Sequence, residues 1–398
     1  MMATHPALVL DVSRLVSRRE RSAPTGIDRV EIDAAKKAIS QARTGEVYFM
    51  ATRGPHSWFL PIDQIEKLVN FLNVRWTSGD GSSNGRTIQL FEGLGLSAYP
   101  PSIPVTTTNA PPRIDNFRSP RAILRTRKVE RRLSRPDVAV TYRNVSHHHL
   151  DKEDFLSSLK TRWCADIEVF WHDAIPISYP EYSRPGDADR HWRRLRATLD
   201  FADTIIVNSS VTEHELRSLS GERDFNIPIQ VEHLKTNLPT PSPVLKAARP
   251  YFITVGTIEP RKNHSMLLHV WRSLAAKLRE DCPHLVIAGR RGWMNSDVFA
   301  MLDRCPVLHD TVHEAPELAD ASLASLVQSA TALLMPSFAE GFGLPFLEAQ
   351  ELGTPVIASD LKVFDEIAIA PFTRLSPLAG DRWMAEIEHA NNAATIAR

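Results

Sequence analysis

The stretch TALLMPSFAEGFGLPFLEAQELGTPVIASD, residues 331–360, decides the fold. An apolar run ends near Pro336, a glycine-rich loop follows, and Pro345 stands where the first turn of a helix accepts proline. That helix is expected to end at Gly353, a good C-terminal cap, before a second apolar run over 355–360. A strand, a helix and a strand in this succession are typical of a parallel β-sheet covered by helices.

The same alternation extends over the whole chain. Short apolar runs rich in Val and Ile alternate with helical patterns, and continuous apolar strands suit a sheet that is buried on both faces. The pattern therefore predicts an α/β, doubly wound fold. The predicted strands are 7–12, 47–51, 88–92, 138–145, 167–173, 204–210, 251–257, 284–289, 331–337 and 355–360.

A proline-rich segment, LPTPSPVLKAARP (238–250), is the best candidate for a domain boundary, because four prolines in thirteen residues disfavour both helix and central strand. We predict a Rossmann-like N-terminal domain over 1–240, a linker over 241–250, a C-terminal domain over 251–380 and a terminal helix over 381–398 that could cross back to the N-terminal domain. Two such domains facing each other would leave a cleft at the carboxyl ends of both sheets, where open α/β sheets bind ligands.

Composition and charge limit the function. The 398 residues suffice for two or three domains. Lys and Arg number 47 and Asp and Glu number 47, so the formal net charge of zero argues against general nucleic-acid binding. Three scattered cysteines without a CxxC pair favour a reducing compartment over a disulfide framework or zinc site. The sequence shows neither a secretory signal pattern nor an apolar run of membrane-spanning length, which favours a cytoplasmic location.

The glycine-rich loop in the opening stretch is predicted to bind an anion. Gly341 and Gly343 let the backbone approach a ligand closely, and the following helix presents N–H groups and the positive end of its dipole. This arrangement suits a diphosphate. Glu340 and Glu348 flank the loop, and their carboxylates could accept paired hydrogen bonds from the vicinal hydroxyls of a sugar or a ribose. Two glutamates at this spacing also occur often by chance.

A pair of cations follows the predicted strand that ends at Gly256. Arg261 and Lys262 lie at its strand–helix turn, on the same carboxyl edge as the Glu340 loop. Adjacent cations there would neutralise a leaving diphosphate, whereas a solvated surface pair is the commoner fate of an Arg-Lys dipeptide. Asn263 could cap the helix that follows.

Four motifs carry a family resemblance: VGTIEPRKNH (255–264), AGRRGW (288–293), EGFGLPFLE (340–348) and TPVIASD (354–360). In this order and spacing they closely resemble the GT4-type retaining glycosyltransferases, which have the GT-B fold. The resemblance is dense over 250–375. It implies that the C-terminal domain holds a nucleotide sugar.

The resemblance also implies roles for single residues. Arg261 and Lys262 would contact the diphosphate, Glu340 would hold hydroxyls of the donor sugar, and Glu348 would take the ribose hydroxyls. Many relatives have an arginine at the position of Thr257, so either Arg261 compensates or the grip on the phosphates is weaker. The implied donor-binding residues are Gly26, Ile27, Gly256, Arg261, Lys262, Arg290, Val312, Glu340, Gly341, Phe342, Gly343, Leu344 and Glu348, and the implied catalytic residues are His172, Arg261, Lys262 and Glu340.

In the N-terminal half, PTGIDRVEIDAAKKA (24–38) has the pattern of a glycine turn before a helix. Thr25 or Asp28 could cap that helix. Gly26 and Ile27 resemble the glycine loop with which relatives reach the donor phosphates. An ordinary strand–helix turn explains the same residues equally well.

Two histidine segments follow. His172, in FWHDAIPISYPEY (170–182), ends a predicted strand and resembles the family's HD-x-x-P element near the donor sugar. Asp173 could orient or charge its ring. We expect SHHHLDKED (146–154) to form a loop near the cleft, with His147 touching the acceptor. Three consecutive histidines cannot ligate one ion cleanly, and a metal site is therefore disfavoured.

The segment RSPRAILRTRKVERRLSR (118–135) carries eight Arg or Lys residues and one acid, Glu130. Ile123 and Leu124 contribute to a modest apolar side if it is helical. It is a candidate for contact with an anionic membrane surface or a phosphorylated lipid carrier, and a solvated helix face is the alternative. The absence of interleaved aromatic residues argues against RNA binding.

Together with the resemblance, these features predict a retaining hexosyltransferase that moves a mannosyl- or deoxyhexosyl-like group from a nucleotide diphosphate sugar to a glycan or lipid-linked acceptor. Its place would be polysaccharide or glycoconjugate synthesis, in the cytoplasm or peripherally on the inner face of the membrane. No DxD carboxylate pair is placed for Mg²⁺, so no metal ion and no cofactor are expected. Two alternatives stay open: a sugar-nucleotide epimerase on the same scaffold, and a catalytically inactive nucleotide-binding subunit.

Overall fold

The structure is a computed structural model, and it describes residues 5–21, 23–78, 84–96, 110–221, 226–236, 238–239, 241 and 245–396. The chain divides into two compact units. Unit 1 comprises Met1–Val74, Thr107–Ser178 and Pro185–Leu234, and unit 2 comprises Arg75–Thr106, Tyr179–Arg184 and Lys235–Arg398.

Unit 1 is built on a seven-stranded sheet in the order β3-β2-β1-β4-β5-β6-β7, whose neighbours run parallel apart from the antiparallel pair β2–β3. Its strands are β1 (His5–Asp11), β2 (Glu46–Arg53), β3 (His56–Leu60), β4 (Val138–Asn144), β5 (Asp166–Trp171), β6 (Thr204–Val207) and β7 (Ile229–Val231). The helices of this part are α1 (Ser13–Arg18), α2 (Gly26–Gln41), α3 (Ile62–Ser78), α5 (Pro120–Leu133), α6 (Glu153–Trp163), α7 (Ile175–Ser178), α8 (Asp187–Phe201) and α9 (Ser210–Ser220).

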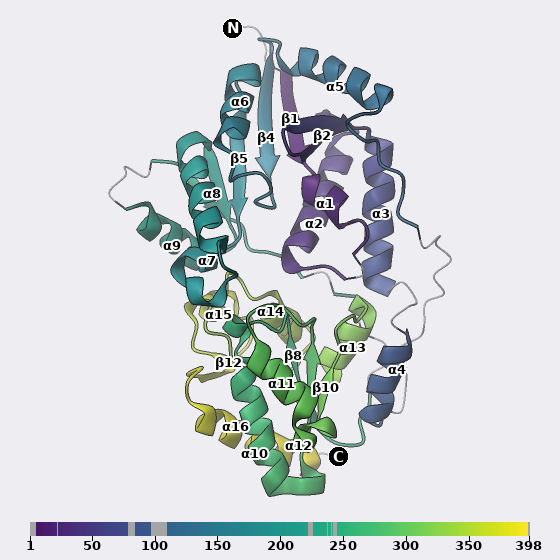
Figure 1. Ribbon diagram of the computed structural model, residues 1–398, viewed down its shortest axis with the longest axis vertical. Helices are drawn as coiled ribbons and strands as arrows, with labels where there is room; N and C mark the ends of the chain where they lie inside the picture. Colours follow the sequence, from purple (N-terminus) through teal and green to yellow (C-terminus); the bar gives the residue numbers. More distant parts are fainter. Residues whose placement is uncertain are drawn as a thin grey trace. The chain divides into compact units, whose positions relative to one another are not determined.

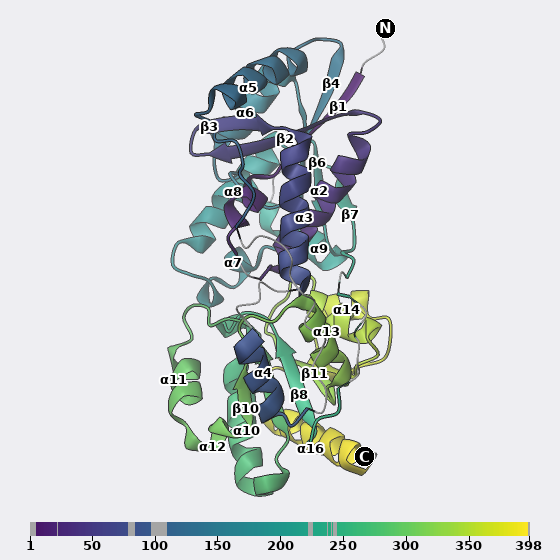
Figure 2. The ribbon, with the colours of Figure 1, turned by 90° about the vertical axis from the view of Figure 1, so that its right-hand side faces the viewer.

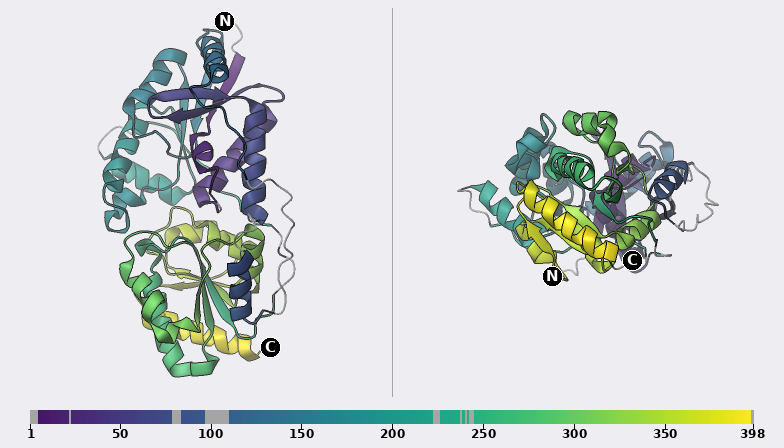
Figure 3. Two further views of the ribbon diagram at one scale, coloured as in Figure 1. Left: turned by 45° about the vertical axis from the view of Figure 1, so that its right-hand side comes forward. Right: turned by 90° about the horizontal axis from the view of Figure 1, so that it is seen from below.

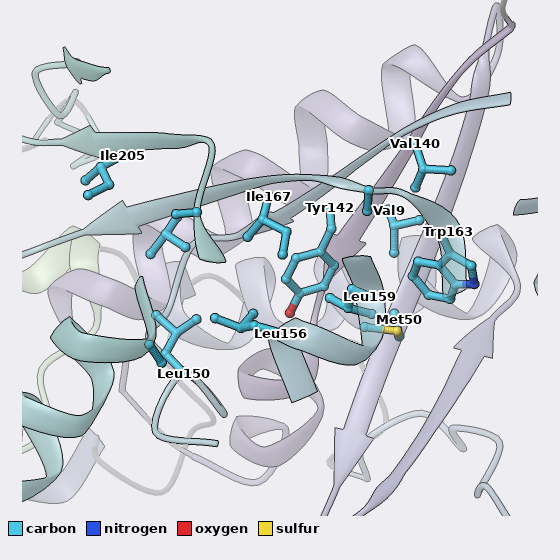
Figure 4. Close-up of a cluster of buried hydrophobic side chains, with 14 of the residues drawn as sticks. Val9, Met50, Val140, Tyr142, Leu150, Leu156, Leu159, Trp163, Ile167 and Ile205 are labelled. Atoms are coloured by element: carbon cyan, nitrogen blue, oxygen red, sulfur yellow. The ribbon is translucent and has the colours of Figure 1, made fainter. Parts of the chain in front are cut away.

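Helices cover both faces of this sheet (Figure 1). The connection from β1 to β2 and the connection from β4 to β5 run in opposite directions across it, so right-handed crossovers put α2 and α6 on opposite faces. Leu156, Leu159 and Trp163 recur at helical spacing on α6 and join Tyr142 and Ile167 in one buried cluster (Figure 4). Burying a large apolar side chain in such a cluster contributes about 1.5–3 kcal/mol.

Unit 2 holds a six-stranded parallel sheet in the order β10-β9-β8-β11-β12-β13. Its strands are β8 (Tyr251–Val255), β9 (His284–Ala288), β10 (Val312–Glu314), β11 (Ala332–Met335), β12 (Val356–Ser359) and β13 (Thr373–Leu375). Its helices are α4 (Asn84–Gly93), α10 (His264–Leu278), α11 (Ser296–Arg304), α12 (Pro306–His309), α13 (Asp320–Ser329), α14 (Leu344–Glu351), α15 (Lys362–Ile367) and α16 (Gly380–Ile396), with 3₁₀ turns at Pro180–Tyr182, Pro260–Lys262 and Arg279–Asp281. The strand order reverses between β8 and β11, the switch point at which such sheets bind ligands.

The terminal helix α16, yellow in Figure 3, packs on α10 within unit 2. Trp383 and Ile387 are fully buried in one cluster with residues of α10, and Lys277 Nζ lies 2.7 Å from Glu388 Oε1. The helix predicted over 381–398 is therefore present, and residues 397 and 398 lie outside the described chain.

The predicted strand 88–92 is wrong, because these residues belong to helix α4. Leu90, Phe91 and Leu94 are buried at helical spacing, and the carbonyl of Leu94 accepts a hydrogen bond from Ala248 N at 3.2 Å. A short apolar run does not distinguish a strand from one face of a helix. Figure 2 shows α4 beside the sheet of unit 2.

Four observed strands were not predicted: β3, β7, β10 and β13. Each is an edge strand of its sheet, and three of the four have only three residues. Edge strands are short and partly solvent-exposed, so they lack the continuous apolar run by which the central strands were found.

The division of the chain also differs from the predicted domains. Among the described residues, 75–78, 84–96 and 179–184, expected in the N-terminal domain 1–240, group with unit 2. In the predicted linker 241–250, residues 242–244 lie outside the described chain. Leu245 is buried, and its N–H donates to Ser329 Oγ at 2.9 Å, so this part of the linker is packed onto unit 2.

Candidate functional site

The switch point of unit 2 collects most of the predicted site residues. One loop follows β8 and contains Arg261 and Lys262, and the other follows β11 and contains Glu340. The two strands are parallel neighbours, which brings both loops to the same edge of the sheet. Phe338 N donates to the carbonyl of Arg261 at 2.9 Å and joins the loops through their backbones.

Glu340 lies between the two predicted cations. Its Oε2 accepts from Arg261 Nη1 at 2.7 Å, and its Oε1 accepts from Lys262 Nζ at 2.5 Å and from Ser337 Oγ at 2.7 Å. Arg261 also binds Glu259 Oε1 through Nη2 at 2.6 Å. The side chains of Arg261, Lys262 and Glu340 are 17%, 12% and 6% exposed, so water screens these ion pairs only weakly.

The ion pairs set the protonation states. Burial acts to raise the pKa of the Glu340 carboxyl, but the charges of Arg261 and Lys262 outweigh burial and lower it to about 2. Burial lowers the pKa of the Lys262 ammonium, and the charge of Glu340 opposes that shift. Formally, Glu259 and Glu340 balance the two cations. An incoming anion would therefore have to share Arg261 and Lys262 with Glu340.

Of the two glycines of the loop, Gly343 has the left-handed backbone for which glycine is suited, and Gly341 does not. Gly343, with φ of 93°, is the N-cap residue of α14. A side chain there would meet the ring of Phe364 at 2.7 Å. Among the described residues, no group accepts the N–H of Gly343 or Leu344. Glu348 is buried one turn further along α14.

The motif AGRRGW requires its glycines because the loop after β9 crosses the loop after β8. A Cβ at Gly289 would lie 1.8 Å from the carbonyl oxygen of Gly256. A Cβ at Gly292 would lie 2.6 Å from Cγ2 of Thr257, the residue that departs from the family pattern. Thr257 therefore fills space under this loop.

Two residues expected near the base lie on neighbouring segments. Arg290 follows β9, and Val312 begins β10, which pairs with β9 in register Val312↔Leu285. Arg290 Nη2 lies 3.1 Å from Glu317 Oε1, which ties the loop after β9 to the segment that follows β10.

The sequence prediction was wrong for the side chain of Asn263, and it missed Glu259. Asn263 is the N-cap residue of α10, but its side chain makes no capping bond and donates instead to the carbonyl of Pro377 at 2.9 Å. Glu259 was not singled out. Its place in the EPRK motif beside the two cations was the available signal, and its partner Arg261 is two residues away.

In unit 1, Gly26 and Ile27 form the first turn of α2. The helix begins with a full capping box, in which Thr25 Oγ1 accepts from Asp28 N and Asp28 Oδ2 accepts from Thr25 N. Asp28 Oδ1 also accepts from Arg14 Nε at 2.6 Å. Both predicted capping residues are thus used, and Arg14 is tied to the same helix end.

His172 and His147 are both buried at the ends of β5 and β4. His172 Nε2 lies 2.7 Å from the carbonyl of Val145, which assigns the proton to that nitrogen, and the N–H of His172 donates to His147 Nε2 at 3.1 Å. Burial lowers the pKa of His172 to about 4, so its ring is neutral at pH 7. The carbonyl of Val145 orients this ring, and the charge of Asp173 acts to raise its pKa against the effect of burial. Asp173 Oδ1 also accepts from Ile175 N at 3.2 Å. His147 accepts a hydrogen bond from the backbone of His172, and its contact with an acceptor stays a prediction.

No three His, Cys, Asp or Glu side chains in the described part of the chain are grouped so as to hold a metal ion. None of the described helices combines the length and the apolar character needed to cross a bilayer.

Residues 241–376 match the family model described as glycosyl transferases group 1. The serotype-specific mannosyltransferase WbdA of Escherichia coli is 32% identical over 215 residues, covering 50% of this chain and 26% of WbdA. The O-antigen chain mannosyltransferase B of Escherichia coli is 31% identical over 207 residues, covering 50% of this chain and 54% of that protein. The D-inositol 3-phosphate glycosyltransferase of Kineococcus radiotolerans is 32% identical over 219 residues, with coverage of 50% and 49%. The chain thus spans about half, or less, of the length of these relatives.

Two solved structures resemble the chain over nearly all of its length. HepE of Anabaena, in complex with UDP, has a TM-score of 0.58 at 15% identity and covers 99% of this chain and 94% of HepE. Sucrose-phosphate synthase of Thermosynechococcus elongatus has a TM-score of 0.59 at 17% identity, with coverage of 97% and 89%. At these identities the likeness concerns the fold. It confirms the predicted GT-B class of two Rossmann-like α/β domains.

Proposed function

We propose that the chain is a group 1 glycosyltransferase that transfers a hexosyl group from a nucleoside diphosphate sugar to a glycan or lipid-linked acceptor with retention of configuration. One observation carries the proposal: Arg261 and Lys262 converge on Glu340 at the switch point of the unit that the family model matches. The mannosyltransferase relatives named for O-antigen chains support a mannosyl-like sugar and a role in polysaccharide synthesis.

The proposed reaction breaks the bond between the anomeric carbon and the phosphate oxygen. The electron pair of that bond goes to the diphosphate, and the sugar passes through an oxocarbenium-like state. The acceptor hydroxyl then bonds to the anomeric carbon on the face that the diphosphate leaves, and its proton goes to the leaving phosphate. Arg261, Lys262 and the N–H groups at the start of α14 stabilise the charge that grows on the phosphate. These cations take the part of a divalent metal, so we expect full activity in the presence of EDTA.

Glu340 has two tasks in this proposal. Its carboxylate holds the two cations in place before the donor binds, and it accepts hydrogen bonds from hydroxyls of the donor sugar. Glu348 and Arg290 would hold the ribose and the base, by likeness to the family.

His172 is proposed to accept a hydrogen bond from the donor sugar. Because Nε2 carries the proton, Nδ1 carries the lone pair, and Nδ1 has no partner among the described residues. The lowered pKa keeps this nitrogen unprotonated at neutral pH. Gly26 and Ile27, at the start of α2, are proposed as a further contact to the donor phosphates.

A thermal-shift screen with GDP, UDP and dTDP tests the donor site, because a ligand that binds only the native state raises the melting temperature. We expect one of them to raise it in the wild type and in Arg272→Ala, which removes an exposed cation of α10. Lys262→Ala should lose the shift and at least about ten-fold in turnover. Normal turnover in Lys262→Ala would contradict the leaving-group role.

The same preparation separates the alternatives. An epimerase would convert the nucleotide sugar without an acceptor, which a donor-only assay detects. An inactive subunit would bind the nucleotide sugar but transfer nothing to any lipid or glycan fraction supplied. Transfer that depends on an acceptor supports the transferase. An α-linked product from an α-linked donor supports retention of configuration.

We also propose that α5 contacts an anionic membrane surface on the cytoplasmic side. Ala122, Val129 and Leu133 are buried, and the opposite face is exposed. Leu124 is 66% exposed at the centre of that face. The exposed cations beside it are Arg121, Arg127, Lys128 and Arg131. Cations around an exposed leucine fit an interface that attracts acidic headgroups and admits one apolar side chain.

Flotation with vesicles of phosphatidylcholine, with and without phosphatidylglycerol, tests this contact. Binding should need the anionic lipid and weaken with salt. The variant Arg127→Glu/Arg131→Glu should lose it, whereas Arg43→Glu, at an exposed position after α2, should not. Equal flotation of all three proteins would refute the contact and would leave the transferase proposal untouched.

A further inference from the structure

Unit 1 gathers a second set of cations at its own switch point. The strand order reverses between β1 and β4, which are parallel neighbours. Arg14 and Arg18 lie on α1, directly after β1, and His148 lies directly after β4. Arg194 comes from α8. We refer to Arg14, Arg18, His148 and Arg194 as the Arg14 cluster.

The two arginines of α1 share one carboxylate. Arg14 Nε lies 2.6 Å from Asp28 Oδ1, and Arg18 Nε lies 3.9 Å from the same atom. The other oxygen of Asp28 accepts from the N–H and the hydroxyl of Thr25, both at 2.8 Å. The guanidinium side chains are only 14% and 24% exposed. One carboxylate therefore balances two partly buried cations.

Two further acids, Asp11 and Glu31, lie close to the cluster. Asp11 is buried and accepts from Ser13 N and from Tyr142 Oη, both at 2.8 Å. Burial raises the pKa of Asp11. Burial, followed by the charge of Asp11, raises the pKa of Glu31 well above its ordinary value, and Glu31 Oε2 has no hydrogen-bond partner among the described residues.

Arg194 completes the cluster from α8, where burial lowers its pKa and the charges of Asp151 and Asp187 oppose that shift. Its Nη1 lies 3.3 Å from His191 Nδ1, and its Nε is buried without a hydrogen-bond partner in the described part of the chain. Burial, followed by the charges of His149, Arg14, Arg194 and Arg18, lowers the pKa of His148 to about 4. These charges thus act on one imidazole from two elements of the fold.

The backbone around His148 is held in an unfavourable conformation. His147 and His149 have φ of 57° and 62°, values that residues other than glycine seldom adopt. Asn144 fixes this turn through its Nδ2, which donates to the carbonyl of His148 at 2.9 Å. Like charges that lie close together cost free energy, which a bound anion would recover.

We propose that the Arg14 cluster binds a phosphate group of the acceptor substrate. Guanidinium groups pair with phosphate oxygens through two parallel hydrogen bonds, and His148 adds a neutral ring nitrogen. The N-terminus of the sixteen-residue helix α2, tied to Arg14 through Asp28 and Thr25, adds its positive dipole end. The acceptor class is therefore a phosphorylated one, either a sugar phosphate or a phosphorylated lipid carrier.

This inference rests on the proposed transferase function, since it needs a second substrate. The donor diphosphate already has Arg261, Lys262 and the start of α14 in unit 2. Unit 1 holds a separate cation set on a separate sheet, and a second set is required when the second substrate is also an anion.

Titration calorimetry of the full chain with inorganic phosphate tests the site. We use the Lys262→Ala background, which weakens the phosphate site of unit 2. In that background Arg18→Ala and Arg194→Ala should each lower phosphate affinity by at least about ten-fold, the effect of losing one charge-assisted contact. The controls Arg19→Ala and Arg193→Ala change exposed neighbours on the same helix or its end and should stay within about two-fold of the parent.

A second arm separates the acceptor phosphate from the donor phosphate. Wild-type protein saturated with the nucleoside diphosphate that binds in the thermal-shift screen should still bind inorganic phosphate. Displacement of phosphate by the nucleotide would assign the cluster to the donor and overturn the proposal. Unchanged phosphate affinity in both Arg18→Ala and Arg194→Ala would overturn it as well.

A third arm tells a lipid-free phosphate acceptor from a phosphate carried on a lipid. Glycerol 1-phosphate and dolichyl- or undecaprenyl-type phosphate in detergent are titrated against the same variants. If the affinity for one probe alone depends on Arg194, that probe identifies the source of the phosphate. If both affinities depend on Arg194, the site accepts either source, and if neither does, the proposal is contradicted. If Arg194→Ala does not fold, Arg194→Lys is used instead, because it keeps the charge and loses only the two parallel hydrogen bonds of the guanidinium.

The two proposals fail separately. If Lys262→Ala binds the nucleotide as the wild type does, the donor site is refuted, and the phosphate titrations still test the Arg14 cluster.

Discussion

The two sheets place polar side chains at the same point, where the strand order reverses, but they balance charge differently. In unit 2 the cations Arg261 and Lys262 are each paired with Glu340 over 2.5–2.7 Å. In unit 1 Arg14 and Arg18 share Asp28, and burial raises the pKa of the neighbouring Glu31. Two carboxylates, Glu259 and Glu340, thus face the two cations of unit 2, whereas the two arginines of α1 share one.

The comparison shows that a switch point alone does not define the chemistry of a site. At the edge of unit 2, Arg261 and Lys262 must exchange Glu340 for the anion when the anion binds. This suits a group that is bound and then released as the reaction proceeds. An edge at which two cations share one carboxylate suits an anion that stays bound as an anchor. The predictions below change one edge at a time, from the largest expected effect to the smallest.

Gly289→Ala should have the largest effect, because its Cβ would lie 1.8 Å from the carbonyl oxygen of Gly256 and would force the loops of unit 2 apart. We expect a loss on the order of 4 kcal/mol, a fall in melting temperature on the order of 10 °C, and no nucleotide binding. Gly45→Ala in unit 1 is the control, since its Cβ would meet Gln41 O at an ordinary 3.6 Å. Calorimetry compares the two, and equal melting temperatures would refute the packing argument.

Glu340→Gln should separate binding from turnover. Removing the carboxylate frees Arg261 and Lys262, so the nucleoside diphosphate should bind several-fold tighter while turnover falls at least about ten-fold. The control Glu388→Gln breaks an ion pair of α16 in the same unit. Weaker nucleotide binding in Glu340→Gln would mean that Glu340 is not the competitor of the diphosphate.

Acid should destabilise the protein through its buried histidines before it reaches Glu340. Burial lowers the folded pKa of His148, His172 and His191 to about 4, below the ordinary value of 6.5. Their stabilisation is therefore complete above pH 6.5 and is lost as pH falls toward 4. The pKa of Glu340, about 2 against 4.5, places its loss below pH 4.5.

Melting temperatures measured from pH 7.5 to 3 check these two windows. His172→Gln should flatten the fall between pH 6.5 and 4, and Glu340→Gln should leave that fall in place. His264 and His284 of unit 2 add to the upper window, because burial lowers their pKa values to about 3 and about 4. A wild-type melting temperature that stays constant down to pH 4 would contradict the buried neutral histidines.

Thr25→Ala should have the smallest effect. It removes the capping box of α2 and one contact of Arg14, and loss of such a cap costs about 1 kcal/mol. The melting temperature should fall by about 2–4 °C. Thr44→Ala, beyond the end of α2, serves as the control. A change in phosphate affinity larger than the change in stability would show that Thr25 also orients Arg14 toward the anion.

The central strands and the start of α2 followed from the sequence, since each depends on residues that are close in the chain. Continuous apolar runs predicted β1, β4, β5, β8 and β11, and Thr25 and Asp28 lie three residues apart, within one turn. The edge strands were missed because exposure weakens their apolar pattern, and residues 88–92 were assigned to a strand because a short run fits either structure.

Motif order and residue type indicated the candidate site of unit 2, including Arg261, Lys262 and Glu340. Only the tertiary structure decided that Glu340 is the partner of both cations, because 78 and 79 residues separate them and the order of the strands brings them together. The same holds for His147 and His172, whose burial and shared hydrogen bond depend on β4 and β5 being neighbours. Local patterns fix secondary structure and candidate chemistry, while protonation and pairing depend on contacts that the chain makes only once it has folded.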